Sequence, residues 1–143
     1  MMIIVSKTHF NQMVKHALSD YPHECCGGLL GTFNTHTKHI KKVVELSNQW
    51  DDTDSETKRR RFKITPSDYK KLEQLADDAK LHLLGFYHSH PDHPAIPSET
   101  DLSYAWPFFS YPIISIMQSK YADIQSYYLD QGQLQKEAVK LLD

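Results

Sequence analysis

The sequence predicts an α/β (α+β) fold in which a mixed, twisted β-sheet is flanked by helices. Apolar runs of strand length alternate with stretches whose apolar residues recur at helical spacing, which is typical of sheets covered by helices. The chain has 143 residues, of which 40% are apolar and 24% are charged, as in an ordinary globular domain. We therefore expect a single domain over residues 1–143.

The N-terminal elements are predicted from periodicity and from residues that begin or end helices. Residues 2–5 are apolar and of strand length, and apolar residues recur at helical spacing over residues 10–18. Thr8 is expected to cap this helix, and Pro22 follows its end. Small and apolar residues over 24–31 indicate a buried strand whose glycines let another chain segment approach closely.

The middle of the chain is predicted to contain a strand, a loop and a second helix. Residues 36–46 alternate loosely, as a strand does, whereas Asn48 to Arg61 is polar and charged without periodicity, which indicates a long loop. Strand character returns at residues 62–64. Pro66 suits a first helical position, and the apolar spacing that follows predicts a helix ending near Lys80.

The C-terminal elements begin with an apolar run over residues 81–89, which predicts a strand. Pro91, Pro94 and Pro97 prevent a strand or helix from continuing, so the chain must turn there. The elements predicted after this turn are a short helix at residues 98–106 and closing strands at residues 113–117, 124–129 and 133–139.

The charge balance excludes several classes of partner. Lys and Arg number 16 against 18 Asp and Glu, and the pI is near 6.5, so no broad positive field attracts nucleic acid or an anionic membrane. No apolar run reaches the length of a signal-peptide core or a membrane span. We expect a cytoplasmic protein that binds neither nucleic acid nor membranes.

The only cysteines, Cys25 and Cys26, are adjacent, and sequence neighbours rarely reach the geometry of an unstrained disulfide. This usage fits a reducing compartment. Side chains of adjacent strand residues face opposite ways, so the two thiols cannot readily share one metal ion. We expect both to be small buried packing residues, with a redox-regulated thiol as the alternative.

His88 and His90 lie two residues apart at the end of an expected strand. Such residues share one face about 6–7 Å apart, so both imidazoles can reach one zinc ion at about 2.0–2.1 Å. A catalytic zinc takes a third protein ligand, and Asp101, in the first turn of a helix capped by Ser98, is suitably placed for it. The alternative is that the histidines are merely hydrogen-bonded and the Ser98–Asp101 pair is only a capping motif.

One string of residues resembles the signature of the JAMM (MPN-plus) zinc metalloprotease family. It reads His88-Ser89-His90, then seven residues from Pro91 to Pro97, then Ser98-Glu99-Thr100-Asp101. The family also has a glutamate far upstream, which matches Glu24 and the Gly-Gly-Leu-Leu-Gly sequence that follows. The resemblance extends from Tyr21 to about Met117 and is closest to the small prokaryotic stand-alone members.

This resemblance implies an MPN/JAMM domain with cytidine-deaminase-like layering. It also implies that His88, His90 and Asp101 hold one Zn2+ per chain, that Glu24 is the general acid/base, and that Ser98 helps to stabilise the oxyanion. Zinc hydrolysis needs such a set, because a carboxylate must take the proton of the attacking water and pass it to the leaving amine.

The family's substrates are conjugates of ubiquitin and ubiquitin-like proteins, cut after a C-terminal Gly-Gly tail. No His or Cys follows His93, so the chain lacks the Cys/His-rich insertion typical of eukaryotic deubiquitinases. It resembles the members that process ubiquitin-like sulfur-carrier proteins, and we expect a zinc-dependent peptidase or isopeptidase acting on such a tail. The alternatives are a deubiquitinase- or desampylase-like Lys isopeptidase and a non-catalytic MPN scaffold.

Two further segments have alternative interpretations. The loop from Asn48 to Arg61 carries a block of acidic residues and then a block of basic ones, which is typical of a solvated loop. The alternative is that this loop clamps an extended substrate tail. The apolar residues from Trp106 to Pro112 are expected in the core, with part of them in a homodimer contact, and the alternative is an exposed surface that binds a partner.

Overall fold

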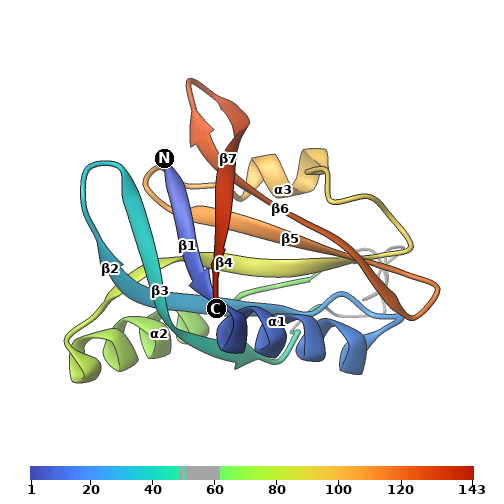
Figure 1. Ribbon diagram of the computed structural model, residues 1–143, viewed down its shortest axis with the longest axis horizontal. Helices are drawn as coiled ribbons and strands as arrows, with labels where there is room; N and C mark the ends of the chain where they lie inside the picture. The colour runs from blue at the N-terminus through green and yellow to red at the C-terminus, as the bar shows by residue number, and fades with distance from the viewer. Residues whose placement is uncertain (49, 51–61) are drawn as a thin grey trace.

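The computed structural model describes residues 1–48, 50 and 62–143 (Figure 1). Its strands follow the order β1-β3-β2-β4-β5-β6-β7 and close into a barrel. Closure results because β1 (Met2–Ser6) pairs in parallel with β3 (Thr37–Leu46) on one side and with β7 (Gln133–Leu142) on the other. The remaining elements are α1 (Lys7–Asp20), β2 (Cys26–Phe33), α2 (Pro66–Ala79), β4 (His82–Pro91), α3 (Glu99–Ser103), β5 (Ser110–Met117) and β6 (Lys120–Asp130). The predicted mixed sheet with helices is confirmed, whereas its closure is a feature that the sequence does not predict.

Helices α1 and α2 cover opposite faces of the sheet. Met13 of α1 packs in one cluster with Cys25 and with apolar residues from all seven strands, as expected of a helix inside a curved sheet. Leu72 of α2 packs in a second cluster with Cys26. Adjacent residues of an extended chain point to opposite faces. Because Cys25 packs with α1 and Cys26 with α2, the two helices lie on opposite faces of the sheet.

A β-bulge between β2 and β4 decides which face the end of β4 presents. The register shifts between Leu29 and Leu30, and Leu84 is left without a partner on β2. Leu84 packs in the cluster on the α1 side, whereas Phe86, two residues later, packs in the cluster on the α2 side. The two histidines at the end of β4 continue the face of Phe86, so they point to the side that α2 covers.

The start of α1 differs from the prediction. The helix begins at Lys7, because the side chain of Ser6 accepts a hydrogen bond from the His9 N–H at 3.2 Å and satisfies one of the free donors of the first turn. Thr8 lies inside the helix, so the prediction that it is the cap is wrong.

Two elements near the site also differ from the prediction. Residues 62–64 form no strand, because the Lys63 N–H donates to the side chain of Asn48 at 3.1 Å instead of joining a ladder. The helix predicted at 98–106 spans only Glu99–Ser103. The predicted turn after β4 is present, and it begins after Pro91, where Asp92 adopts a left-handed conformation with φ 58°.

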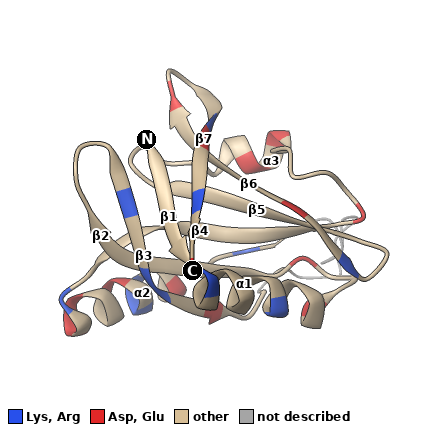
Figure 2. Ribbon diagram, in the orientation of Figure 1, with Lys and Arg blue, Asp and Glu red and all other residues tan. Residues whose placement is uncertain are grey.

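The charged loop predicted from Asn48 to Arg61 lies outside the described residues except for Asn48 and Trp50. Elsewhere, Lys, Arg, Asp and Glu are intermixed along the outer side of α2 (Figure 2). Among the residues that the structure describes, no helix combines the length and apolar character needed to cross a membrane.

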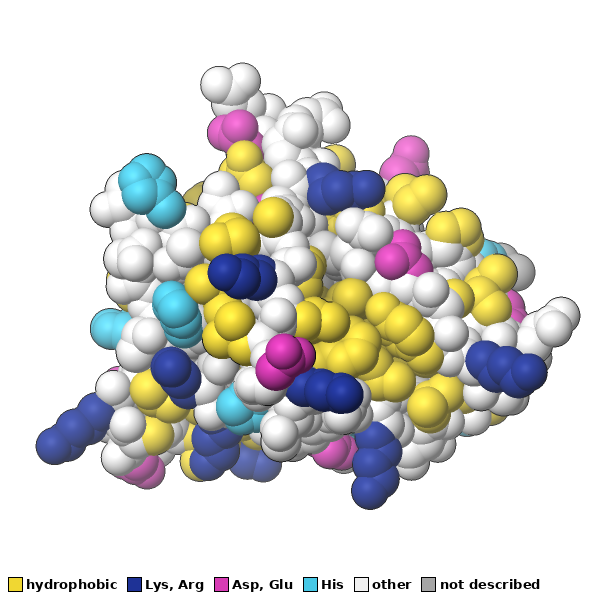
Figure 3. Space-filling model, viewed as in Figure 1, with side chains coloured by type: hydrophobic (Ala, Val, Ile, Leu, Met, Phe, Trp, Pro, Cys, Tyr) yellow, Lys and Arg dark blue, Asp and Glu magenta, His cyan; other side chains and the backbone are white. Residues whose placement is uncertain are grey.

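Strands β6 and β7 diverge after a short paired region. They pair only where Ser126–Asp130 face Gln133–Glu137. Beyond that region Ile124, Val139 and Leu141 line a hollow of about 420 Å³ between the strands. Figure 3 shows apolar side chains gathered near the centre of this face of the molecule. The barrel is therefore closed by β1 and β7 but open along part of the β6–β7 seam.

Gly31 provides a test of close strand approach. A Cβ atom at this position would lie 1.8 Å from the backbone oxygen of His39 on β3, so we expect Gly31→Ala to destabilise the fold by about 2–3 kcal/mol. Gly132, in the β6–β7 turn, has φ +75° and nothing within 4 Å of its Cβ position, so Gly132→Ala should lose only about 1 kcal/mol. Urea unfolding of both variants measures the difference, and equal losses would contradict the assigned close approach.

Candidate metal centre

The end of β4 brings two imidazoles together. His88 and His90 point to the same face, and their Nε2 atoms lie 3.1 Å apart. Both side chains are buried, with 2% of His88 and 8% of His90 exposed. The ring of Phe62 stacks on His88 with centroids 4.5 Å apart and shields it from solvent. The expected convergence of the two imidazoles is therefore present in the fold.

Helix α3 brings a carboxylate to the same point. Asp101 Oδ1 lies 3.2 Å from His88 Nε2, and Asp101 Oδ2 lies 3.2 Å from His90 Nε2. Ser98 caps α3 and forms a capping box, in which its Oγ accepts from the Asp101 N–H at 3.0 Å and its N–H donates to Asp101 Oδ2 at 2.9 Å. The cap therefore aims this carboxylate at the histidines.

The hydrogen bonds around the site leave acceptor atoms facing one another. His90 Nδ1 lies 2.9 Å from the Pro94 carbonyl oxygen, which can only accept, so Nδ1 carries the hydrogen. The Nε2 of a neutral His90 then presents a lone pair to the Asp101 carboxylate. A partner of this kind on the second nitrogen is typical of metal-bound histidine. The arrangement therefore favours a cation among the three side chains.

The pKa values of two of these residues agree with a neutral imidazole at His88 and a charged carboxylate at Asp101. Burial lowers the pKa of His88, although the nearby Asp101 carboxylate opposes this change. Burial alone would raise the pKa of Asp101, but the neighbouring His88 and the hydrogen bond from the Ser98 N–H bring it well below its usual range. These are the protonation states that metal ligands require.

The distances between donor atoms fit a tetrahedral ion. Ligand atoms about 2.0–2.1 Å from a tetrahedral zinc lie about 3.3 Å from one another. The separations among His88, His90 and Asp101 are 3.1–3.2 Å. The carboxylate of Glu24 lies beside them and forms with His88 and His90 a cluster whose ligand atoms are all within 4.8 Å of one another. The residues predicted as metal ligands and as general acid/base are therefore brought together.

Two polar side chains that the sequence analysis missed contact the chain at Glu24. Asn48 Nδ2 donates to the Glu24 carbonyl oxygen at 3.0 Å, and Ser89 Oγ accepts from the Cys25 N–H at 2.8 Å. A hydroxyl between two histidines on an apolar strand was the only signal for Ser89. The contact of Asn48 with Glu24 leaves no local signal, because the two residues lie 24 positions apart in sequence.

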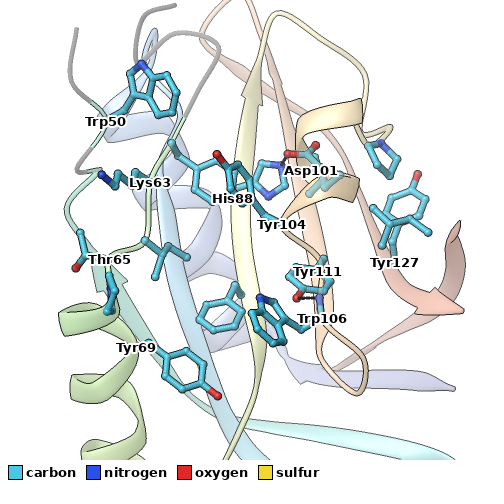
Figure 4. Close-up of a pocket in the computed structure, with 17 residues that line it drawn as sticks. Trp50, Lys63, Thr65, Tyr69, His88, Asp101, Tyr104, Trp106, Tyr111 and Tyr127 are labelled. Atoms are coloured by element: carbon cyan, nitrogen blue, oxygen red, sulfur yellow. Dashed lines mark hydrogen bonds and ion pairs between the residues drawn. The ribbon is translucent and has the colours of Figure 1, made fainter. Parts of the chain in front are cut away.

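A cavity of about 410 Å³ opens beside the histidines (Figure 4). His88 and Asp101 line one part of it, and Figure 4 shows Tyr69 of α2 facing Trp106 and Tyr111 across another part. The aromatic residues that line it are Trp50, Phe62, Tyr69, Phe86, Tyr104, Trp106, Tyr111 and Tyr127. The candidate metal site therefore opens into a largely aromatic recess.

The aromatic cluster from Trp106 to Pro112 is only partly in the core. Pro112 is buried, but 67% of Trp106 and 44% of Phe108 are exposed and Pro107 is exposed as well, so the core prediction is wrong for these three residues. Trp106 is held on the cavity wall because its backbone N–H donates to the Tyr111 hydroxyl at 2.7 Å. A homodimer contact formed by this cluster stays a prediction.

The two cysteines behave as predicted for packing residues. Cys25 and Cys26 are both 0% exposed and neither forms a disulfide. Burial raises the pKa of Cys25 to about 12 and also raises the pKa of Cys26. Because the thiolate is the reactive form, the redox-regulated alternative is disfavoured.

Comparison with known proteins identifies the family. Prokaryotic homologs of the JAB domain match residues 6–130 of the chain. The chain belongs to this prokaryotic JAB family. A JAB1/MPN domain protein from Archaeoglobus fulgidus has the same fold, with a TM-score of 0.62 at 16% identity over 99% of this JAB-family chain and 97% of the other. The MPN/JAMM fold implied by the sequence resemblance is therefore confirmed.

Two relatives of this JAB-family protein carry names that state an activity. The CysO-cysteine peptidase of Mycobacterium tuberculosis (strain ATCC 25618 / H37Rv) is 26% identical over 144 residues, which cover 99% of this chain and 92% of the relative. The desampylase of Haloferax volcanii is 31% identical over 100 residues, which cover 69% of this chain and 67% of the relative. These similarities support a hydrolase of the JAMM isopeptidase type.

The candidate metal centre predicts different zinc contents for substitutions of two nearby histidines. His93 is exposed in the turn after β4, and its backbone oxygen, rather than its ring, accepts a hydrogen bond from Ser115. We expect about one zinc ion per chain in the wild-type protein and in His93→Ala, and almost none in His90→Ala after dialysis. Elemental analysis measures the ratio. Undiminished zinc in His90→Ala would move the metal site elsewhere, and zinc-free wild-type protein after reconstitution would favour the non-catalytic scaffold.

Proposed function

We propose that this protein is a zinc-dependent peptidase or isopeptidase that hydrolyses the bond after the C-terminal Gly-Gly of a ubiquitin-like sulfur-carrier protein. The observation that supports it most is the convergence of three zinc-type donors at 3.1–3.2 Å with a buried glutamate beside them. We assign the ion to His88, His90 and Asp101, and the acid/base role to Glu24.

Glu24 is suited to moving the proton of the attacking water. Zinc, when bound, polarises the substrate carbonyl and makes a bound water more acidic. The Glu24 side chain is 5% exposed, so it accepts the proton in a site with little competing solvent. It then passes the proton to the nitrogen of the leaving amine as the C–N bond breaks. The hydroxyl group of the water joins the carbonyl carbon. The other hydrogen of the water, which Glu24 carries, ends on the leaving amine.

Ser98 has a second function in this proposal. Its Oγ accepts from the Asp101 N–H at 3.0 Å, and a hydroxyl that accepts one hydrogen bond still has its own hydrogen to donate. The cap and the oxyanion role are therefore compatible. A donor aimed at the developing oxyanion contributed about 2.7–4 kcal/mol in a well-studied protease.

The cavity supports a Gly-Gly tail as the part of the substrate near the ion. Aromatic walls lie on both sides of His88 (Figure 4), so residues without a Cβ leave the backbone room to reach it. Apolar side chains farther along the tail suit the recess lined by Tyr69 and Trp106. The name of the mycobacterial relative supports cysteine as the leaving group, and that of the haloarchaeal relative supports a second candidate, a Lys isopeptidase.

Removal of the Glu24 acid/base function should separate catalysis from metal binding. We expect Glu24→Gln to keep its zinc and fold, since the ligands are unchanged, while turnover falls at least about 100-fold. The matched control is Glu99→Gln, which neutralises an exposed carboxylate on α3 and should leave turnover unchanged. Steady-state kinetics with zinc analysis measures both variants. Near-normal turnover by Glu24→Gln would rule out the assigned role.

Two conjugates of one carrier protein distinguish the candidate substrates. In the first, the C-terminal Gly-Gly is joined to the α-amine of cysteine, and in the second to the ε-amine of lysine. We expect kcat/KM to be about 10-fold higher or more for the cysteine conjugate than for the lysine conjugate, because cysteine is the proposed leaving group. Mass spectrometry follows both cleavages. A preference for the lysine conjugate would instead favour the desampylase-like Lys isopeptidase.

A further inference from the structure

Glu24 lies just outside the regular strand pairing that holds the rest of the site. Strand β2 begins at Cys26, which pairs with His88. Glu24 is two residues before this start, so ladder hydrogen bonds alone do not set the orientation of the peptide group that follows it. Since a misplacement of about 1 Å can lower a catalytic rate about 100-fold, something must hold this peptide group.

The two polar atoms of that peptide group are held by two side chains from different parts of the fold. Its carbonyl oxygen accepts from Asn48 Nδ2 at 3.0 Å, and its N–H, which belongs to Cys25, donates to Ser89 Oγ at 2.8 Å. We propose that Asn48 and Ser89 are positioning residues that hold the peptide group after Glu24 from both ends and thereby orient its carboxylate. This inference rests on the proposed acid/base role of Glu24.

Ser89 connects this peptide group directly to the metal ligands. It is 0% exposed and lies between His88 and His90 on β4, with its side chain on the opposite face of the sheet. Its backbone N–H also donates to the Cys25 carbonyl oxygen at 3.1 Å. The residue between the two histidines thus binds Cys25 through both its backbone and its hydroxyl, so the ligands and Glu24 share one rigid support.

Asn48 connects the same peptide group to the cavity wall. Its Oδ1 accepts from the Trp50 N–H at 3.0 Å and from the Lys63 N–H at 3.1 Å, while its Nδ2 donates to the Glu24 carbonyl. All three contacts require the same amide orientation, because two partners only donate and the third only accepts. Both Trp50 and Lys63 line the cavity, so Asn48 couples the substrate recess to Glu24.

Substitutions can separate these contacts. Ser89→Ala removes the hydroxyl, and Ser89→Thr restores it. Asn48→Asp keeps acceptor oxygens for the N–H groups of Trp50 and Lys63 but loses the donor to the Glu24 carbonyl. The matched controls are Ser126→Ala, which removes another fully buried hydroxyl, bonded to Glu137, and Asn34→Asp, in which Oδ1 likewise accepts from two backbone N–H groups.

We expect Ser89→Ala and Asn48→Asp to lower kcat about 10- to 100-fold on the Gly-Gly-cysteine conjugate, with KM and zinc content close to wild type. Ser89→Thr and both controls should keep the wild-type kcat. A loss of stability alone would affect Ser126→Ala as well and would not be reversed by threonine.

Amide hydrogen exchange tests the same contacts without using activity. Loss of its acceptor in Ser89→Ala should speed exchange of the Cys25 N–H at least about 10-fold, whereas Ser89→Thr should restore protection. Two results would overturn the positioning role but not the proposed function. One is unchanged exchange of the Cys25 N–H in Ser89→Ala, and the other is a kcat within about 2-fold of wild type in both Ser89→Ala and Asn48→Asp while Glu24→Gln is inactive. An inactive wild-type protein, or an active Glu24→Gln, would instead overturn the proposed function and the positioning role with it.

Discussion

The antiparallel pairing of β2 with β4 is the constraint on which the site depends. Cys26 faces His88 in this ladder, so the chain that precedes β2 runs beside the end of β4, and Glu24 meets the two histidines. The bulge at Leu84 then decides which face the histidines present. A register slip of one residue would turn them toward α1 and away from the cavity, because side chains on a strand alternate between faces.

The electrostatics of the site follow from burial at that strand end. Two imidazoles and a carboxylate are brought within 3.2 Å of one another where little water reaches them. A buried charge is unfavourable unless it is paired or binds a metal. His90 already donates its Nδ1 hydrogen to Pro94, so its other nitrogen adds an acceptor and no positive charge. This set of donors is the basis for the proposed divalent ion.

The candidate metal site and the recess beside it share some residues but are held mainly by different segments. The proposed metal ligands and Glu24 are supported by β2, β4 and a capped turn of α3, where backbone pairing and the capping box limit motion. The aromatic recess also uses residues 62–66 and Tyr69 at the start of α2, and Tyr104, Trp106 and Tyr111 between α3 and β5. Residues such as Tyr69 and Trp106 line the recess without contributing to the proposed ligand set, so under the proposed function they are positions where substrate preference can change.

The sequence by itself determined the features that depend on nearby residues. The order of strands and helices follows from periodicity, and the Ser98–Asp101 capping box and the shared face of His88 and His90 follow from spacings of three and two residues. The proposed role of Glu24 was accessible only through the family resemblance, because no local pattern links it to the histidines.

Only the tertiary structure decided the closure by β1 and β7, the contacts of Asn48 and Ser89 with the chain at Glu24, and the exposure of Trp106. These features join segments far apart in sequence, and their free energy depends on how the whole core packs rather than on local conformational preference.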